Sequence, residues 1–169
     1  MKIETTRFGL LEVPAEKVLT FEEGLPGFEK ERLFALVAEK EGGPFYWLQS
    51  LDRGDLAFVV ADPCHFLPSY EFELPPQEAE KLGLQDAADL AIFAIITVPE
   101  NPAEMTANLQ APVLINLKNH RGRQVILSEG SYPIRYRILE GLRQLAARSS
   151  QGETPKKEEL AVLAQRAAG

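Results

Sequence analysis

The sequence predicts a mainly β protein: a small antiparallel β-barrel-like domain with one short helix and a helical C-terminal tail. Three observations carry this prediction. Short apolar or alternating runs are broken by Gly and Pro along most of the 169 residues, a rhythm typical of strands. There are too few helices to connect parallel strands, so short turns must join antiparallel neighbours. After about Ile138 the pattern becomes helical.

Nine segments have the composition and boundaries of strands. In residues 70–74, Tyr70, Phe72 and Leu74 share one face. Glu71 and Glu73 share the other, so we expect this strand to be half-buried. The remaining predicted strands are residues 2–13, 18–21, 32–38, 45–50, 56–61, 90–98, 112–118 and 123–129.

The run at 90–98 is apolar throughout, so it is either a strand covered on both sides or a short buried helix. Its β-branched C-terminal half and the following Pro99 favour the strand. Residues 76–83 predict the helix of the body, with proline at the start and Gly83 at the end.

The helical pattern after Ile138 divides the chain into a β domain over 1–138 and an extension over 139–169 that is helical or partly disordered. A polar spacer separates its two helical stretches, and Thr154 and Pro155 suit the start of the second. Since the tail contributes few core residues, we predict that truncation after Ile138 leaves a cooperative unfolding transition.

Charge is distributed unevenly along the chain. Residues 1–105 hold 8 Lys and Arg against 20 Asp and Glu, a net charge of −12, whereas residues 106–169 hold 10 against 5, a net charge of +5. An acidic surface repels phosphate backbones and attracts basic proteins, which disfavours direct nucleic-acid binding. The alternative explanation is that the acidic charge only keeps the protein soluble. No apolar run could span a membrane and the start lacks a signal-peptide core, so we expect a cytoplasmic protein with no membrane partner.

Four potential metal ligands, Asp52, Asp55, Asp62 and His65, lie close together in the sequence. Their spacing matches no helical His pair and no acidic calcium loop. Asp52 and Asp55 are better explained by a turn between two strands. We therefore predict no metal site.

Cys64 stands beside His65, which suggests a nucleophile and its base. Neighbours in a strand point to opposite faces, so we expect instead a half-buried Cys64 and a surface His65. No nucleophile elbow, phosphate-binding Gly motif or dinucleotide fingerprint occurs. The sequence predicts neither an enzyme nor a cofactor.

A basic hairpin loop at 119–122 joins the two predicted strands at 112–118 and 123–129. An RNA-binding β-barrel that uses the basic edge at 118–137 is therefore the alternative function. The acidic body would oppose a polyanion there. The cations of this edge are Lys118, His120, Arg121, Arg123, Arg135 and Arg137.

Several motifs together, in this order and spacing, resemble the FliW family of flagellar assembly factors over about residues 2–138. No single motif would suffice. They are "EGLPGFE" at 23–29, "FYWLQSLD" at 45–52, "LAFVV" at 56–60, "PSYEFEL" at 68–74, "TVPENPAEMTANLQAPVLIN" at 97–116, "GRQVIL" at 122–127, and Tyr132 with Arg135.

The resemblance implies a cytoplasmic β protein that works by binding proteins rather than by catalysis. FliW proteins bind flagellin and the translational repressor CsrA, and switch between the two. Released FliW captures CsrA and lifts its block on flagellin messenger RNA, so flagellin synthesis follows assembly. We expect the free protein to be a monomer.

We expect the contact surface for CsrA in the acidic, aromatic-flanked segment from Asp52 to Glu73, whose carboxylates can meet a basic repressor. An apolar interface centred on Phe66, Leu67 and Tyr70 is the competing interpretation. Met105 and Asn108 belong to the most extensive family motif and are expected in a partly polar connection before the hairpin, where Asn108 fixes the backbone. The predicted partner-binding residues are Asp52, Asp55, Phe66, Leu67, Tyr70, Glu71, Glu73, Met105 and Asn108.

Overall fold

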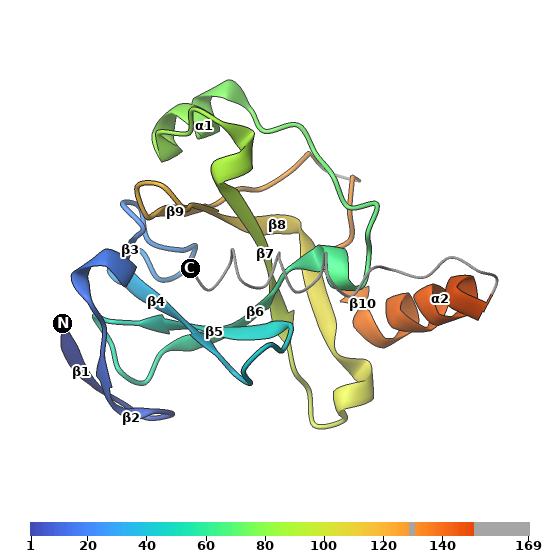
Figure 1. Cartoon of the computed structure of the whole chain (residues 1–169), viewed down its shortest axis with the longest axis horizontal. Helices are drawn as coiled ribbons and strands as arrows, with labels where there is room; N and C mark the ends of the chain where they lie inside the picture. Colours follow the sequence, from blue (N-terminus) through green and yellow to red (C-terminus); the bar gives the residue numbers. More distant parts are fainter. Residues whose placement is uncertain (129–130, 151–169) are drawn as a thin grey trace.

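The computed structural model describes residues 1–128 and 131–150 (Figure 1). Within them the chain is mainly β, as predicted, and the short turns between successive strands explain why the pairing is largely antiparallel. The strands are β1 Lys2–Thr5, β2 Gly9–Glu12, β3 Leu19–Thr20, β4 Leu33–Ala38, β5 Phe45–Ser50, β6 Ala57–Ala61, β7 Leu90–Thr97, β8 Thr106–Asn116, β9 Arg121–Gln124 and β10 Tyr136–Arg137; the helices are α1 Pro76–Leu82 and α2 Ile138–Ser150.

Strands β3 to β9 form a ring. The order is β8-β7-β6-β5-β4-β3-β9, and β9 pairs back onto β8. All of these pairs are antiparallel except β3 with β9, which meet at Thr20 and Arg121. β10 adds a short pairing to the start of β8, at Thr106 and Ala107, on the edge opposite β7. Because each ring strand has two neighbours, the ring leaves no free edge along its central strands.

The main core fills the ring with large apolar side chains from alternate strand positions. Phe21 and Phe34 meet edge to face with ring centroids 5.1 Å apart, and Tyr46 meets Phe93 in the same way at 6.1 Å. Burying each such side chain contributes about 1.5–3 kcal/mol. This core rigidly positions the strands that carry the outward-facing side chains.

The predicted single strand at 2–13 is wrong, because the segment turns back on itself. β1 and β2 form a hairpin that is a separate sheet. Gly9 has a φ of 62°, which glycine adopts without strain, and the Thr5 hydroxyl donates to its carbonyl at 2.8 Å.

Helix α1 confirms the predicted helix at 76–83. Pro76 begins it, and Gly83 ends it in the left-handed conformation with a φ of 64°. The carbonyl of buried Leu82 accepts hydrogen bonds from the side-chain amides of Asn116 (3.0 Å) and Asn119 (2.9 Å). These hydrogen bonds hold the β8–β9 loop against the C-terminal end of α1.

The predicted strand at 70–74 is wrong, although its two faces are as expected. The segment is extended but joins no ladder, because β7, β9 and β10 already occupy the edges of β8. The Tyr132 hydroxyl, and not a neighbouring strand, satisfies the backbone of Glu71. It accepts from the Glu71 N–H at 3.1 Å and donates to the Glu71 carbonyl at 2.9 Å. Glu71 and Glu73 remain exposed, whereas Phe72 is half-buried.

The β8–β9 hairpin is confirmed, but its boundaries differ from those predicted. β8 begins at Thr106, so Asn108 lies within a strand and not in a connection before it. β9 ends at Gln124, although the backbone N–H groups of Val125 and Leu127 still donate to the Pro112 and Gln110 carbonyls of β8. The predicted strand at 90–98 is confirmed as β7.

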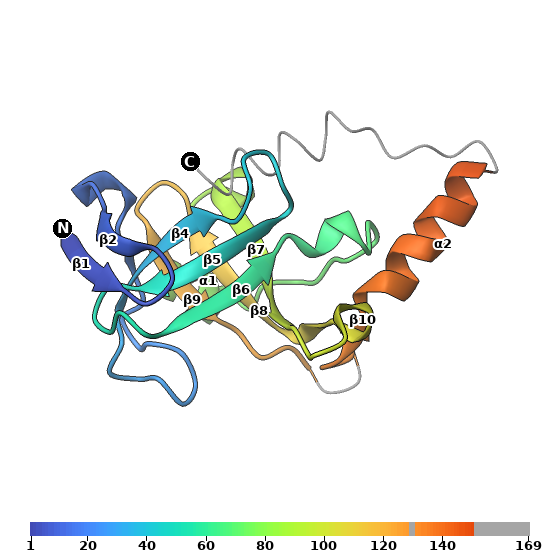
Figure 2. The same ribbon diagram turned by 90° about the horizontal axis from the view of Figure 1, so that it is seen from below.

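Helix α2 projects from the body beside β10 (Figure 2). Its first residue, Ile138, is buried in a cluster that also contains Phe66, and a Cβ on Gly141 would lie 2.7 Å from the Phe66 carbonyl oxygen. The first turn of α2 is thus packed on the body. The helix predicted from Thr154 onward lies outside the described residues, and the division at 138 stays a prediction.

Candidate partner-binding surfaces

Asp52 and Asp55 lie on the turn between β5 and β6 and are engaged by their own chain. The Asp52 carboxylate accepts from the backbone N–H groups of Arg32 (2.6 Å) and Leu33 (2.9 Å). The Arg53 side chain donates to Asp55 at 2.8 Å, and this hydrogen bond lowers the pKa of Asp55. Both residues are exposed, yet their negative charge is partly committed to holding this turn.

Glu71 and Glu73 are exposed at the other end of β6. In the described part of the chain, no side-chain hydrogen bond or ion pair involves either carboxylate. The five residues of β6 separate them from the Asp52 turn, a distance of about 15 Å along the strand. The structure therefore places the predicted acidic residues in two groups.

Phe66 and Tyr70 lie inside the fold, with only 3% and 6% of their surfaces exposed. Phe66 stacks on Tyr136 with ring centroids 5.8 Å apart. The Tyr70 hydroxyl donates to the Leu109 carbonyl at 2.7 Å, and burial raises the pKa of Tyr70. In this structure both stabilise the body beneath Glu71, while Leu67 is half-buried.

Asn108 shapes an irregularity in β8. Between Phe93 and Ile95 of β7, the pairing on β8 jumps from Val113 to Asn108, so β8 carries extra residues there. The Asn108 side-chain oxygen accepts from the N–H groups of Gln110 (3.2 Å) and Ala111 (3.1 Å). Its visible role is to satisfy this backbone.

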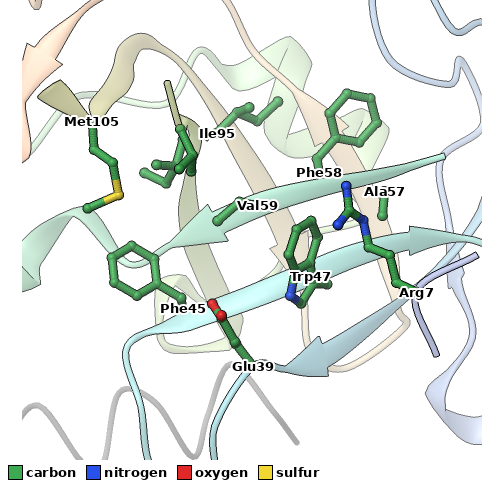
Figure 3. Close-up of a pocket in the computed structure, with 11 residues that line it drawn as sticks. Arg7, Glu39, Phe45, Trp47, Ala57, Phe58, Val59, Ile95 and Met105 are labelled. Atoms are coloured by element: carbon green, nitrogen blue, oxygen red, sulfur yellow. The ribbon is translucent and has the colours of Figure 1, made fainter. Parts of the chain in front are cut away.

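Met105 lines an apolar groove on the outer face of the ring, across β5, β6 and β7 (Figure 3). The groove has a volume of about 560 Å³. Phe45 and Trp47 stand on its β5 side, with Val59 of β6 between them and Met105. Arg7 and Glu39 add one charge of each sign to its lining.

Sequence reasoning missed this groove, although a signal was present. In "FYWLQS" the residues of both faces are apolar: Tyr46 and Leu48 fill the core, and Phe45 and Trp47 face the groove. A two-faced apolar strand predicts cover on both sides. Among the described residues, Arg7 and Phe8 lie against Trp47 on the second face, and Phe45 and Trp47 are only half-buried there.

The basic hairpin is largely neutralised by ion pairs. Arg123 meets Glu78 at 2.7 Å and Glu23 at 3.1 Å. Arg121 lies 3.9 Å from Glu22. These arginines therefore link the hairpin to α1 and to the 22–23 turn, which leaves less positive charge for a polyanion.

Cys64 and His65 occupy a single 3₁₀ turn, Pro63–His65, whose start is capped by Asp62. The expected surface position of His65 is wrong: it is half-buried, and burial lowers its pKa. Burial also raises the pKa of Cys64 to about 12, which opposes formation of a nucleophilic thiolate. Among the described residues, no cluster of three or more His, Cys, Asp or Glu could hold a metal ion.

The raised pKa predicts slow alkylation of Cys64 in the folded protein. With a pKa of about 12, the thiolate fraction at pH 7.5 is far smaller than in the unfolded chain, where a thiol has a pKa of about 8.5. We expect iodoacetamide to react at least about 100-fold more slowly in buffer than in denaturant. The folded-state rate should rise with pH; equal rates in both states would contradict this assignment.

Within residues 1–128 and 131–150, no helix is both long and apolar enough to cross a membrane. Residues 2–138 match the model of the FliW protein family. The chain belongs to the FliW family.

The alignments with close relatives cover nearly the whole length of those proteins. The flagellar assembly factor FliW of Caldanaerobacter subterraneus subsp. tengcongensis is 46% identical over 144 residues, which cover 85% of this chain and 96% of the relative. That of Alkaliphilus metalliredigens is 40% identical over 153 residues, 89% of this chain and 94% of the relative. A crystal structure of a flagellar assembly factor FliW superposes with a TM-score of 0.77 at 36% identity, covering 82% of this chain and 96% of that one.

Proposed function

We propose that this chain is a cytoplasmic, non-enzymatic flagellar assembly factor that binds flagellin and the repressor CsrA. By capturing CsrA it antagonises RNA binding and couples flagellin synthesis to assembly. The observation that carries the proposal is the family match over residues 2–138. The free protein acts as a monomer in this proposal.

Two unlike surfaces support a protein that serves two partners. Glu71 and Glu73 offer exposed carboxylates on a segment anchored through Tyr132, and such charges suit a basic RNA-binding protein. The groove lined by Trp47 and Met105 is apolar and suits a partner with apolar surface.

Carboxylates near the repressor can also act on RNA without occupying its site. A bound acidic surface repels the phosphate backbone over a range of about 8 Å at physiological salt. CsrA held against Glu71 and Glu73 would therefore bind its messenger less well even if its RNA site stayed open.

Direct RNA binding by the basic edge is the less supported alternative. Arg121 and Arg123 already have acidic partners within the chain. These ion pairs would have to break before the two arginines could contact RNA phosphates. The acidic body would also repel the polyanion.

Isothermal titration of the purified chain separates these possibilities in three arms: CsrA, monomeric flagellin and flagellin leader RNA. We expect saturable binding of each protein and no salt-sensitive binding of RNA alone. RNA binding that Arg121→Glu with Arg123→Glu abolishes would favour the alternative. Absence of binding to both proteins would overturn the proposal.

A further inference from the structure

The apolar groove has the shape of a trough that runs along β6. Cross-strand pairing places Trp47 opposite Val59 and Val59 opposite Ile96, so these residues lie side by side on one face. Trp47 rises on one side and Met105 on the other (Figure 3). β5 and β7 are two strand spacings apart, about 10 Å.

The width and the closed ring together select the kind of segment that fits. An extended peptide gains affinity by pairing with a free sheet edge, but β5, β6 and β7 each have strand neighbours on both sides. A helix satisfies its own backbone hydrogen bonds and has a diameter of about 10–12 Å. The groove therefore suits a helix that lies along β6 with its apolar face against the groove.

The charge at the rim adds a requirement. The Arg7 guanidinium lies 4.0 Å from the centroid of the Trp47 ring, and among the described residues no ion pair engages Arg7. An acidic side chain on the bound helix would gain a charge-assisted contact with this cation. A basic surface such as that of an RNA-binding repressor would be repelled at this end.

The apolar surface extends beyond the trough. Phe58 and Ile95 line both the groove and a second hollow of about 330 Å³ that reaches the exposed Ile126. A continuous apolar surface of this kind marks an interaction site. It can accommodate more than one helical turn.

We propose that this groove docks an amphipathic α-helix of flagellin, with its apolar face between Trp47 and Met105 and an acidic residue beside Arg7. This inference rests on the proposed function. Of the two partners, flagellin is favoured because the Arg7 cation at the rim of the groove would repel the basic surface of an RNA-binding repressor.

Trp47 makes the proposal directly testable, because it is the single tryptophan of the chain. Full-length protein labelled with 5-fluorotryptophan reports on the groove through one ¹⁹F resonance, whatever tryptophans the unlabelled partner contains. We expect monomeric flagellin to shift this resonance and CsrA to leave it in place. Exchange-protected flagellin residues should show apolar side chains at helical spacing.

Two matched pairs of variants test the contacts. Val98 is 50% exposed in the groove and Ile134 is 58% exposed outside it; Val98→Glu should weaken flagellin binding about tenfold or more, and Ile134→Glu should not. Arg7→Glu should weaken it several-fold, whereas Lys30→Glu, the same charge change at another exposed site, should not. CsrA affinity should be unchanged in Val98→Glu.

The outcomes separate this inference from the function on which it rests. If unmodified protein fails to bind flagellin, the proposed function fails. If it binds flagellin while the ¹⁹F resonance stays fixed and Val98→Glu binds equally well, only the groove assignment fails. A shift caused by CsrA, by raising the protein concentration alone, or by removing residues 151–169 alone would assign the groove to CsrA, a second copy or the chain's own tail, and each would overturn the inference.

Discussion

Replacing Gly122 by Ala is expected to lower the free energy of unfolding by about 3 kcal/mol. A Cβ at this position would lie 2.3 Å from Cζ and 2.5 Å from Cε1 of Phe21. Phe21 is fully buried and packs edge to face on Phe34, so its ring has no space to move into. Gly122 also follows Arg121, where β9 meets β3 and closes the ring.

Urea denaturation measures this loss, and a double-mutant cycle assigns its cause. Phe21→Leu removes the atoms that the new Cβ would meet, so Gly122→Ala should cost markedly less in that background. Gly43→Ala is the matched control, because its Cβ would lie 3.3 Å from the Lys40 carbonyl oxygen, and we expect a change below about 1 kcal/mol. A Gly122→Ala protein as stable as the parent would show that the ring closes differently.

Reversing Glu71 and Glu73 to Lys is expected to slow association with CsrA about tenfold at low salt. Both side chains are exposed and charged on an anchored segment, so they can steer a basic partner before contact forms. Added salt should reduce the difference between parent and variant, since exposed charges are screened over about 8 Å at physiological ionic strength. Association and dissociation rates from surface plasmon resonance across a salt series measure this effect.

Glu16→Lys with Glu41→Lys provides the control, with the same exposure and change in net charge at two sites outside the groove. This control should leave the CsrA association rate close to that of the parent. Equal rates and salt slopes for the Glu71, Glu73 variant and the parent, with both folded, would place the CsrA contact elsewhere. Flagellin binding should survive in the Glu71, Glu73 variant if the two partners use separate surfaces.

Local patterns predicted most of the individual elements. Pro76 and Gly83 bounded α1 because helix ends have strong residue preferences. Pairing partners were less predictable. Alternation in 70–74 identified which side chains face inward, but a strand also needs a free neighbouring edge, and β8 has none to offer.

The candidate surfaces depended still more on tertiary structure. Sequence proximity grouped Asp52 with Glu71, but β6 runs between them and separates the two ends. Tyr70 was a candidate contact of the competing apolar interface, and in the structure its hydroxyl donates to the Leu109 carbonyl inside the fold. The groove needed side chains from separate strands, with Trp47 and Val59 brought together by strand register.

The exchange of partners is the central claim, and a leader-RNA binding assay tests it most directly. Fluorescently labelled flagellin leader RNA is first saturated with CsrA, the purified chain is added, and monomeric flagellin follows, with anisotropy recorded throughout. The account predicts that anisotropy falls when the chain captures CsrA and recovers when flagellin occupies the chain. RNA that stays bound to CsrA after the chain is added, or that does not rebind CsrA after flagellin is added, would contradict it.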